Sequence, residues 1–180
     1  YDAGNGIAPD HAAAASWYRK AADQDHVLAQ VYLGVLYLMG DGVRQDYGKA
    51  ARLFRKPAES GNDQAQFYLG AMYAEGHGVE KSGPEAIHWL TKSAAQRNTR
   101  AMGLLAVGLF SRARDARDLI EAYAWSHLAA ELDPIQAQTS TRKVIEKYCN
   151  GEQKKRGKAL VAEWKRKWAS EDKAAAAASR

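Results

Sequence analysis

Two glycine pairs are the first residues whose spacing could support chemistry. Gly40-Asp-Gly42 and Gly76-His-Gly78 have the spacing that lets a backbone approach a phosphate group. A dinucleotide-binding loop needs a third glycine and a P-loop needs a Lys before Ser or Thr, and neither pair is followed by these residues. Each pair also follows a helical pattern, whereas phosphate-binding loops follow strands. We therefore interpret both pairs as turns and expect no bound cofactor.

The histidines and the single cysteine form no catalytic or metal-binding pattern. The histidines stand at unrelated positions, without a His-Glu-x-x-His pair or a carboxylate cluster; they are His11, His26, His77, His88 and His127. Cys149 is the only cysteine, so the chain can form neither an internal disulfide nor a zinc site with paired thiolates. We interpret Cys149 as a buried packing residue. The sequence predicts no enzyme, with no catalytic and no metal-ligating residues.

Basic residues concentrate near the C-terminus. The chain of 180 residues has 26 Lys and Arg, 21 Asp and Glu and a net charge of +5, and residues 142–180 hold 12 of the basic but only 5 of the acidic residues. A basic helix there could contact nucleic acid, anionic lipid, polysaccharide or an acidic protein, and a solvated helix face explains the charge equally well. The candidate contacts are Lys154, Lys155 and Lys158.

Arg112 and Arg114 begin a second basic cluster, in which neighbouring acidic residues dilute the charge. This cluster could receive an acidic loop of a partner. Trp164 and Trp168 are interspersed with the C-terminal charges, but the helical pattern places both on an apolar face, where they cannot stack on bases. We therefore keep nucleic-acid binding as a minor alternative.

The elements that must position these residues recur every 36 residues. The repeated positions include Tyr1, Tyr37 and Tyr73, then Gly6, Gly42 and Gly78, then Trp17, Trp89 and Trp125. A fixed period of this size is typical of a solenoid, in which each repeat buries its apolar face against its neighbours.

Each repeat is predicted to be a first helix, a glycine turn and a second helix. In residues 29–62 the first helix carries apolar residues at helical spacing from Ala29 to Tyr37, and Asp46 stands where it can cap the second helix. An incomplete repeat precedes it, with a second helix over His11–Ala22. A degenerate repeat over Ala101–Leu132 lacks the glycine pair.

Two helices without the period are predicted after Pro134. They cover about Ile135–Tyr148 and Gly151–Trp168, and Asn150 can cap the second of them. We interpret residues 133–168 as capping helices that close the last repeat. Residues 169–180, with five consecutive alanines, suit either a frayed helix end or a disordered tail.

These repeats resemble the Sel-one-like repeat family, which is related to the tetratricopeptide repeat. The residues that carry the resemblance in one repeat are Ala29, Leu33, Gly34, Tyr37, Gly40, Gly42, Val43, Lys49, Ala50, Lys56 and Ala58; in the next they are Ala65, Leu69, Gly70, Tyr73, Gly76, Gly78, Val79, Ala86, Trp89 and Lys92. The resemblance covers residues 1–132. It implies an all-α fold, a right-handed α-solenoid of helix-turn-helix repeats, and an adaptor that assembles complexes without catalysing a reaction.

A partner-binding groove is predicted on the first helices, opposite the motif residues. This side carries Val31, Val35 and Leu38, and their equivalents in the next two repeats, and it is apolar or glycine throughout. Such a face could accept an apolar helix or peptide, but neighbouring helices could also bury it. We assign Val35, Ala71 and Val107 to the core, and leave both readings open for the candidate groove residues, which are Val31, Leu38, Phe67 and Phe110.

The N-terminal edge of the solenoid is a further candidate contact surface. Tyr1 falls in the middle of a repeat, so the sequence has the character of a fragment without its targeting segment. We expect upstream repeats or a second copy of the chain to cover the apolar side of residues 11–22. Apolar stretches are too short for a membrane span, and the compartment stays open between a bacterial periplasm or envelope and a cytoplasm.

The sequence as a whole predicts a non-catalytic scaffold or adaptor that binds a partner protein or peptide through its concave face. The alternative is binding of a polyanion by the basic C-terminal helix.

Overall fold

The computed structural model describes residues 10–134 and 140–179. The chain divides into two compact units, Tyr1–Asn98 (unit 1) and Thr99–Arg180 (unit 2), and each is described by itself. The described residues contain helices and no strand, which confirms the predicted all-α repeat fold. None of the helices in the described ranges combines the length and apolar character that a membrane span requires.

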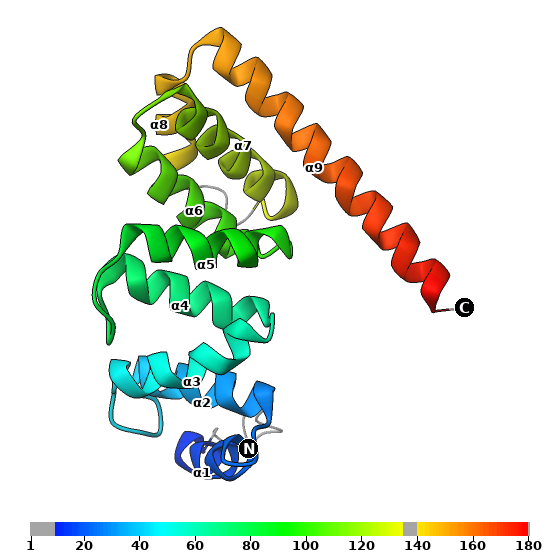
Figure 1. Cartoon of the computed structure of the whole chain (residues 1–180). Coiled ribbons are helices and arrows are strands. Elements are labelled where there is room, and N and C mark those ends of the chain that lie inside the picture. The colour runs from blue at the N-terminus through cyan, green and yellow to red at the C-terminus, as the bar shows by residue number, and fades with distance from the viewer. Residues whose placement is uncertain (1–9, 135–139, 180) are drawn as a thin grey trace. The chain divides into compact units, whose positions relative to one another are not determined.

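Unit 1 is a stack of helices in which each packs against the next along the chain (Figure 1). Its helices are α1 (His11–Ala22), α2 (Val27–Met39), α3 (Tyr47–Glu59), α4 (Asp63–Glu75) and α5 (Gly83–Ala95). Helices α2 and α4 are the predicted first helices, and α1, α3 and α5 are the second helices.

Unit 2 contains the degenerate repeat and the C-terminal helices. They are α6 (Thr99–Arg112), α7 (Ala116–Leu132), α8 (Ser140–Tyr148) and α9 (Gly151–Ala178). The predicted start of α8 at Ile135 lies outside the described residues. Helix α9 starts at the predicted capping box of Asn150 and Gln153, and continues past Trp168, where the sequence pattern placed its end.

Capping residues at one repeat position begin the second helices. Asp10, Asp46 and Ser82 precede α1, α3 and α5, and each side chain accepts a hydrogen bond from the backbone N–H three residues later. Such a cap stabilises a helix by about 1 kcal/mol. The cap predicted at Asp46 is confirmed, with a bond of 2.9 Å from the amide of Lys49.

The glycine pairs end the first helices and also contact the preceding repeat. Gly40 and Gly76 end α2 and α4 with φ of 75° and 80°, the left-handed conformation that glycine tolerates. The second glycine of each pair, Gly42 or Gly78, lies so close to the backbone at the start of the preceding second helix that a Cβ atom would overlap it. The pairs are turns, as predicted, and they are also the points where each repeat contacts the preceding repeat.

Glycine also brings the two helices of one repeat together. The face of Gly34 on α2 lies against the ring of Phe54 on α3, and Gly70 on α4 lies against Leu90 on α5. A Cβ atom at either glycine would come within 3 Å of that side chain. Small and large residues are therefore matched across each helix pair.

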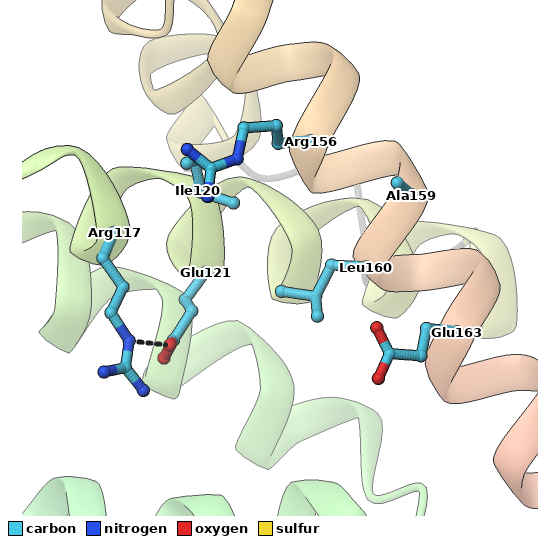
Figure 2. A pocket seen from close by; sticks show the side chains of 7 residues that line it. All are labelled: Arg117, Ile120, Glu121, Arg156, Ala159, Leu160 and Glu163. Carbon is cyan, nitrogen blue, oxygen red and sulfur yellow. Dashed lines mark hydrogen bonds and ion pairs between the residues drawn. The ribbon is translucent and has the colours of Figure 1, made fainter.

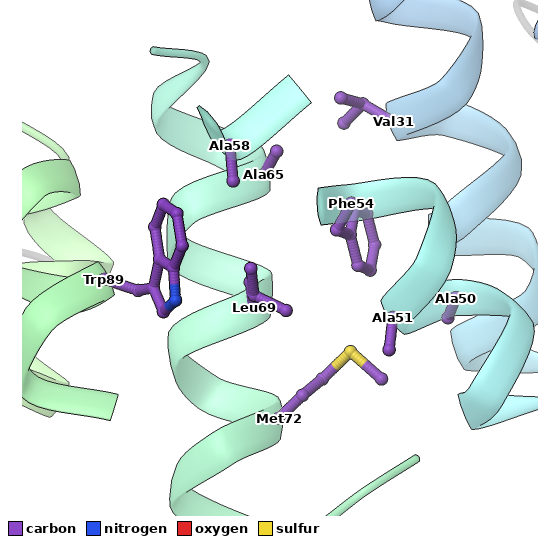
Figure 3. Close-up of a cluster of buried hydrophobic side chains, with 9 residues drawn as sticks. All are labelled: Val31, Ala50, Ala51, Phe54, Ala58, Ala65, Leu69, Met72 and Trp89. Carbon is purple, nitrogen blue, oxygen red and sulfur yellow. The ribbon is translucent and has the colours of Figure 1, made fainter. Parts of the chain in front are cut away.

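The core of unit 1 is continuous from repeat to repeat (Figure 3). One buried cluster joins Val31 of α2, Phe54 of α3, Leu69 and Met72 of α4, and Trp89 of α5. Phe54 is fully buried between the helices of two repeats. Each repeat thus completes the core of its neighbour, as a solenoid requires.

We predict that Gly78→Ala lowers the free energy of unfolding by at least about 2 kcal/mol, because the residue has a φ of 69° and its Cβ would overlap the backbone of Tyr47 and Gly48. Gly61→Ala separates backbone strain from steric overlap, since Gly61 has a φ of 94° but no atom lies near an added Cβ. We expect this variant to lower the free energy of unfolding by about 1 kcal/mol.

Gly83→Ala is the control, because Gly83 has open space around it and no positive φ. Urea unfolding monitored by circular dichroism measures the free energy of unfolding of the wild type and of all three variants. Equal losses for Gly78→Ala and Gly61→Ala would show that the contact between repeats contributes nothing beyond backbone strain.

Candidate protein-binding surfaces

The predicted groove residues do not form one exposed face. Val31 is only 2% exposed and belongs to the core cluster, so of the two interpretations left open for it the core is correct, and it is not available as a groove residue. Leu38 is partly buried and packs against the same cluster. Phe67 is partly buried and meets the ring of Tyr68 edge-on, with 5.1 Å between centroids.

Phe110 lies in unit 2, at the end of α6. Its ring meets that of Tyr148 on α8 edge-on, with 5.4 Å between centroids. Tyr148 itself is 66% exposed and Val144, one turn earlier, is 42% exposed. The candidate residue thus borders an exposed apolar surface that α8 contributes.

The exposed apolar residues of the first helices lie at other repeat positions than predicted. On α2 they are Leu28 (52% exposed), Tyr32 (46%) and Met39 (63%). Val35 lies between them and is partly buried against the core cluster, as predicted, and we call these four residues the α2 stripe. Their spacing of four, three and four residues places them on one side of the helix.

Two of these positions remain apolar in the other first helices. Tyr68 and Ala71 occupy them on α4, where both are partly buried. Leu104 and Val107 occupy them on α6, each 38% exposed, so the assignment of Val107 to the core is wrong. The sequence contains a signal for this surface, because all three first helices carry two apolar residues three positions apart.

The N-terminal face of unit 1 exposes residues that are buried elsewhere in the chain. Trp17 on α1 is 57% exposed, whereas Trp89 and Trp125 at the equivalent positions are 9% and 7% exposed. The ammonium of Lys20 lies 4.6 Å from the centroid of the Trp17 ring. Tyr18, next to Trp17, stacks on Tyr32 at 5.2 Å.

The basic candidates are spread over two parts of unit 2. Lys155 and Lys158 are exposed on the first turns of α9, and Lys154 is partly buried there. Arg112, at the end of α6, lies 3.9 Å from Asp118, while the backbone N–H of Arg114 donates to the same carboxylate at 3.1 Å. Asp118 therefore offsets part of the positive charge of the smaller cluster.

The ionisable groups buried in unit 2 have packing roles. Cys149 is 4% exposed, its Sγ lies 3.6 Å from the carbonyl oxygen of Leu119, and burial raises the pKa of its thiol. His127 stacks on Tyr123 at 4.0 Å, and burial lowers the pKa of its imidazole. Within the described ranges no three His, Cys, Asp or Glu side chains lie close enough to hold a metal ion.

Helix pairs at a 36-residue period and a core shared between neighbouring repeats define a helical repeat protein. The family model of the Sel1 repeat matches residues 1–26, 27–62, 63–98 and 108–134. The chain belongs to this family, as its sequence motifs predict. Sel1 repeat proteins are in general scaffolds for protein interaction.

Solved structures that are similar to the chain include the following two. A protective antigen of uropathogenic Escherichia coli strains that displays an SLR fold has a TM-score of 0.83 and 32% identity, over 94% of this chain and 36% of that protein. A Sel1 repeat protein from Oxalobacter formigenes has a TM-score of 0.70 and 27% identity, over 89% of this chain and 66% of that protein. The chain thus spans only part of each relative. Among curated proteins, none is similar enough to count as a match.

We predict that the thiol of Cys149 reacts with a disulfide reagent at least about tenfold more slowly in the folded protein than in urea, because burial restricts access and disfavours the thiolate. Release of thionitrobenzoate at pH 8 measures both rates. Equal rates would identify Cys149 as an accessible, reactive thiol.

Proposed function

We propose that this protein is a non-catalytic scaffold that binds a partner protein through the exposed apolar face of its first helices. The observation that carries the proposal is the α2 stripe, in which Leu28, Tyr32 and Met39 are each close to half exposed or more. Large apolar side chains rarely gather on a free surface of a soluble protein unless something binds there.

Part of the α2 stripe is specific to this repeat. The equivalents of Leu28 are Gln64 and Arg100, and the equivalents of Met39 are Glu75 and Ser111. Stacking of repeats therefore does not require an apolar residue at either position. An amphipathic helix or an apolar peptide segment of the partner suits a stripe of this spacing.

We predict that the double variant Leu28→Glu, Met39→Glu loses at least about 90% of partner binding with little change in stability, because both side chains are more than half exposed. The matched control is Gln24→Glu, Gln64→Glu, which adds the same charge at two exposed residues outside the stripe. Affinity capture from the lysate of the source organism, eluted in steps of rising salt, compares the three proteins by mass spectrometry.

A protein retained by the wild type and the control, and lost by the stripe variant, supports the scaffold. Retention of that protein by all three would contradict a role for α2. Recovery of nucleic acid or another polyanion alone, released at low salt, would instead favour the basic residues Lys154, Lys155 and Lys158 of α9.

We also infer that the face around Trp17 is covered by the first helix of a preceding repeat. The equivalents of Trp17 support this inference, since Leu53 packs against a buried cluster that contains Leu33 and Leu36 of its own first helix. Trp89 likewise lies in the core cluster with Leu69 of its first helix.

Adding a first helix before α1 tests whether such a helix covers Trp17. The junction can be made at the helix caps, because Asp10 and Asp46 cap equivalent helices. Replacement of residues 1–10 by a copy of residues 27–46 supplies α1 with a first helix. We predict that it stabilises the chain by about 2 kcal/mol and protects Trp17 from acrylamide quenching, because the indole is removed from water.

The control graft carries glutamate at the copies of Leu33 and Leu36, and the Trp17→Phe variant isolates the signal of Trp17. Unchanged stability and quenching would contradict the inference. If light scattering shows that the wild type is a dimer, and Trp17 is already protected from quenching, a second copy of the chain covers Trp17 in place of a preceding repeat.

A further inference from the structure

A cavity of about 400 Å³ lies between α7 and α9 of unit 2 (Figure 2). Helix α7 contributes Arg117, Ile120 and Glu121, from one turn and a half of the helix. Helix α9 contributes Arg156, Ala159, Leu160 and Glu163, whose spacing of three, one and three residues places them on one face. We call this cavity the α7–α9 groove.

The groove has an apolar floor. Leu160 points from α9 into the space between the helices, and the buried Ile120 lies on the α7 side (Figure 2). One turn further along both helices, the rings of Trp125 and Trp164 stack with 4.0 Å between centroids. This stack joins the two helices beyond the groove.

Each of the two helices contributes one positive and one negative side chain around the floor. Arg117 and Glu121 on α7 are paired at 2.9 Å. Arg156 and Glu163 on α9 form no ion pair within the part of the chain that the structure describes. They are seven residues apart, which separates them by roughly 10 Å along the helix. The groove therefore offers one free positive and one free negative group on either side of Leu160.

We propose that the α7–α9 groove binds an amphipathic helix of a partner protein that carries an acidic and a basic residue about two turns apart, with leucine-like side chains between them. A helix suits the groove because its backbone groups are satisfied internally. An extended peptide needs a row of backbone partners, whereas the mid-helix amides and carbonyls of α7 and α9 are already bonded and the free polar groups of the lining are only the side chains of Arg156 and Glu163.

The two free charges also determine the direction of the bound helix. Its acidic residue contacts Arg156, near the start of α9, and its basic residue contacts Glu163. Its apolar side chains meet Leu160 and Ile120. Opposite charges at the two ends favour one orientation and disfavour the reverse.

Two synthetic peptides that differ in one charged residue test the proposal. Each is an alanine-rich helix of about 16 residues with leucine three and four positions after the first charged residue. One carries glutamate at the first charged position and lysine seven positions later, and the other carries glutamate at both positions, so that it cannot satisfy Arg156 and Glu163 in either direction. Fluorescence anisotropy of the labelled peptides measures binding to the full chain, to the variant Glu163→Arg, and to Ala159→Arg.

We expect the wild type to bind the Glu/Lys peptide about fivefold more tightly than the Glu/Glu peptide, and Glu163→Arg, which makes both free charges positive, to reverse this preference. Ala159→Arg should weaken both peptides at least about fivefold, because the exposed Ala159 gives its new side chain room to fill the groove. Circular dichroism confirms that the variants remain folded.

Absence of binding to the wild type at millimolar peptide would overturn the proposal. So would equal binding of both peptides by both proteins, since the charges would then have no role. Binding that Ala159→Arg leaves unchanged would place the peptide elsewhere, and the α2 stripe variant Leu28→Glu, Met39→Glu then identifies whether it lies on α2.

Discussion

Main-chain contact between successive repeats determines the spacing of the helices in unit 1. Gly42 lies against the backbone at the start of α1, and Gly78 lies against the backbone at the start of α3. Backbone atoms cannot move aside by changing rotamer, so this distance is less adjustable than one between side chains. The depth at which Phe54 enters the core, and the packing of Trp89 behind it, follow from that spacing.

The same spacing decides which side chains of a first helix remain exposed. In unit 1, a first helix has neighbours on two sides, its own second helix and the second helix of the preceding repeat. Val31 points between them and is buried, whereas Tyr32, one residue later, is close to half exposed. A rotation of about 100° around the helix axis thus separates core from surface. Leu28 and Met39 of the α2 stripe are more than half exposed, so the neighbouring helices leave that part of α2 largely uncovered.

The fold could be predicted from the sequence because its signals are local and repeated. Asp46, Gly40 and Gly76 each specify a helix end within a few residues of themselves. The surfaces depend on how two helices flank a third, and helical spacing alone does not distinguish Val31 from Tyr32. The α7–α9 groove depends on the angle between helices joined by α8, and no motif within Arg117–Glu121 or Arg156–Glu163 encodes that angle. Cys149 was predicted as buried because no activating partner accompanied it.

The main-chain character of the contact at Gly42 and Gly78 has an evolutionary consequence. A contact between backbone atoms depends little on the side chains around it, provided that glycine is kept. A duplicated repeat can therefore dock on its parent at once and diversify afterwards. Leu28 and Gln64, or Met39 and Glu75, illustrate such divergence, because they occupy equivalent places in repeats that stack in the same way. The scaffold can change what it recognises without changing how it is assembled.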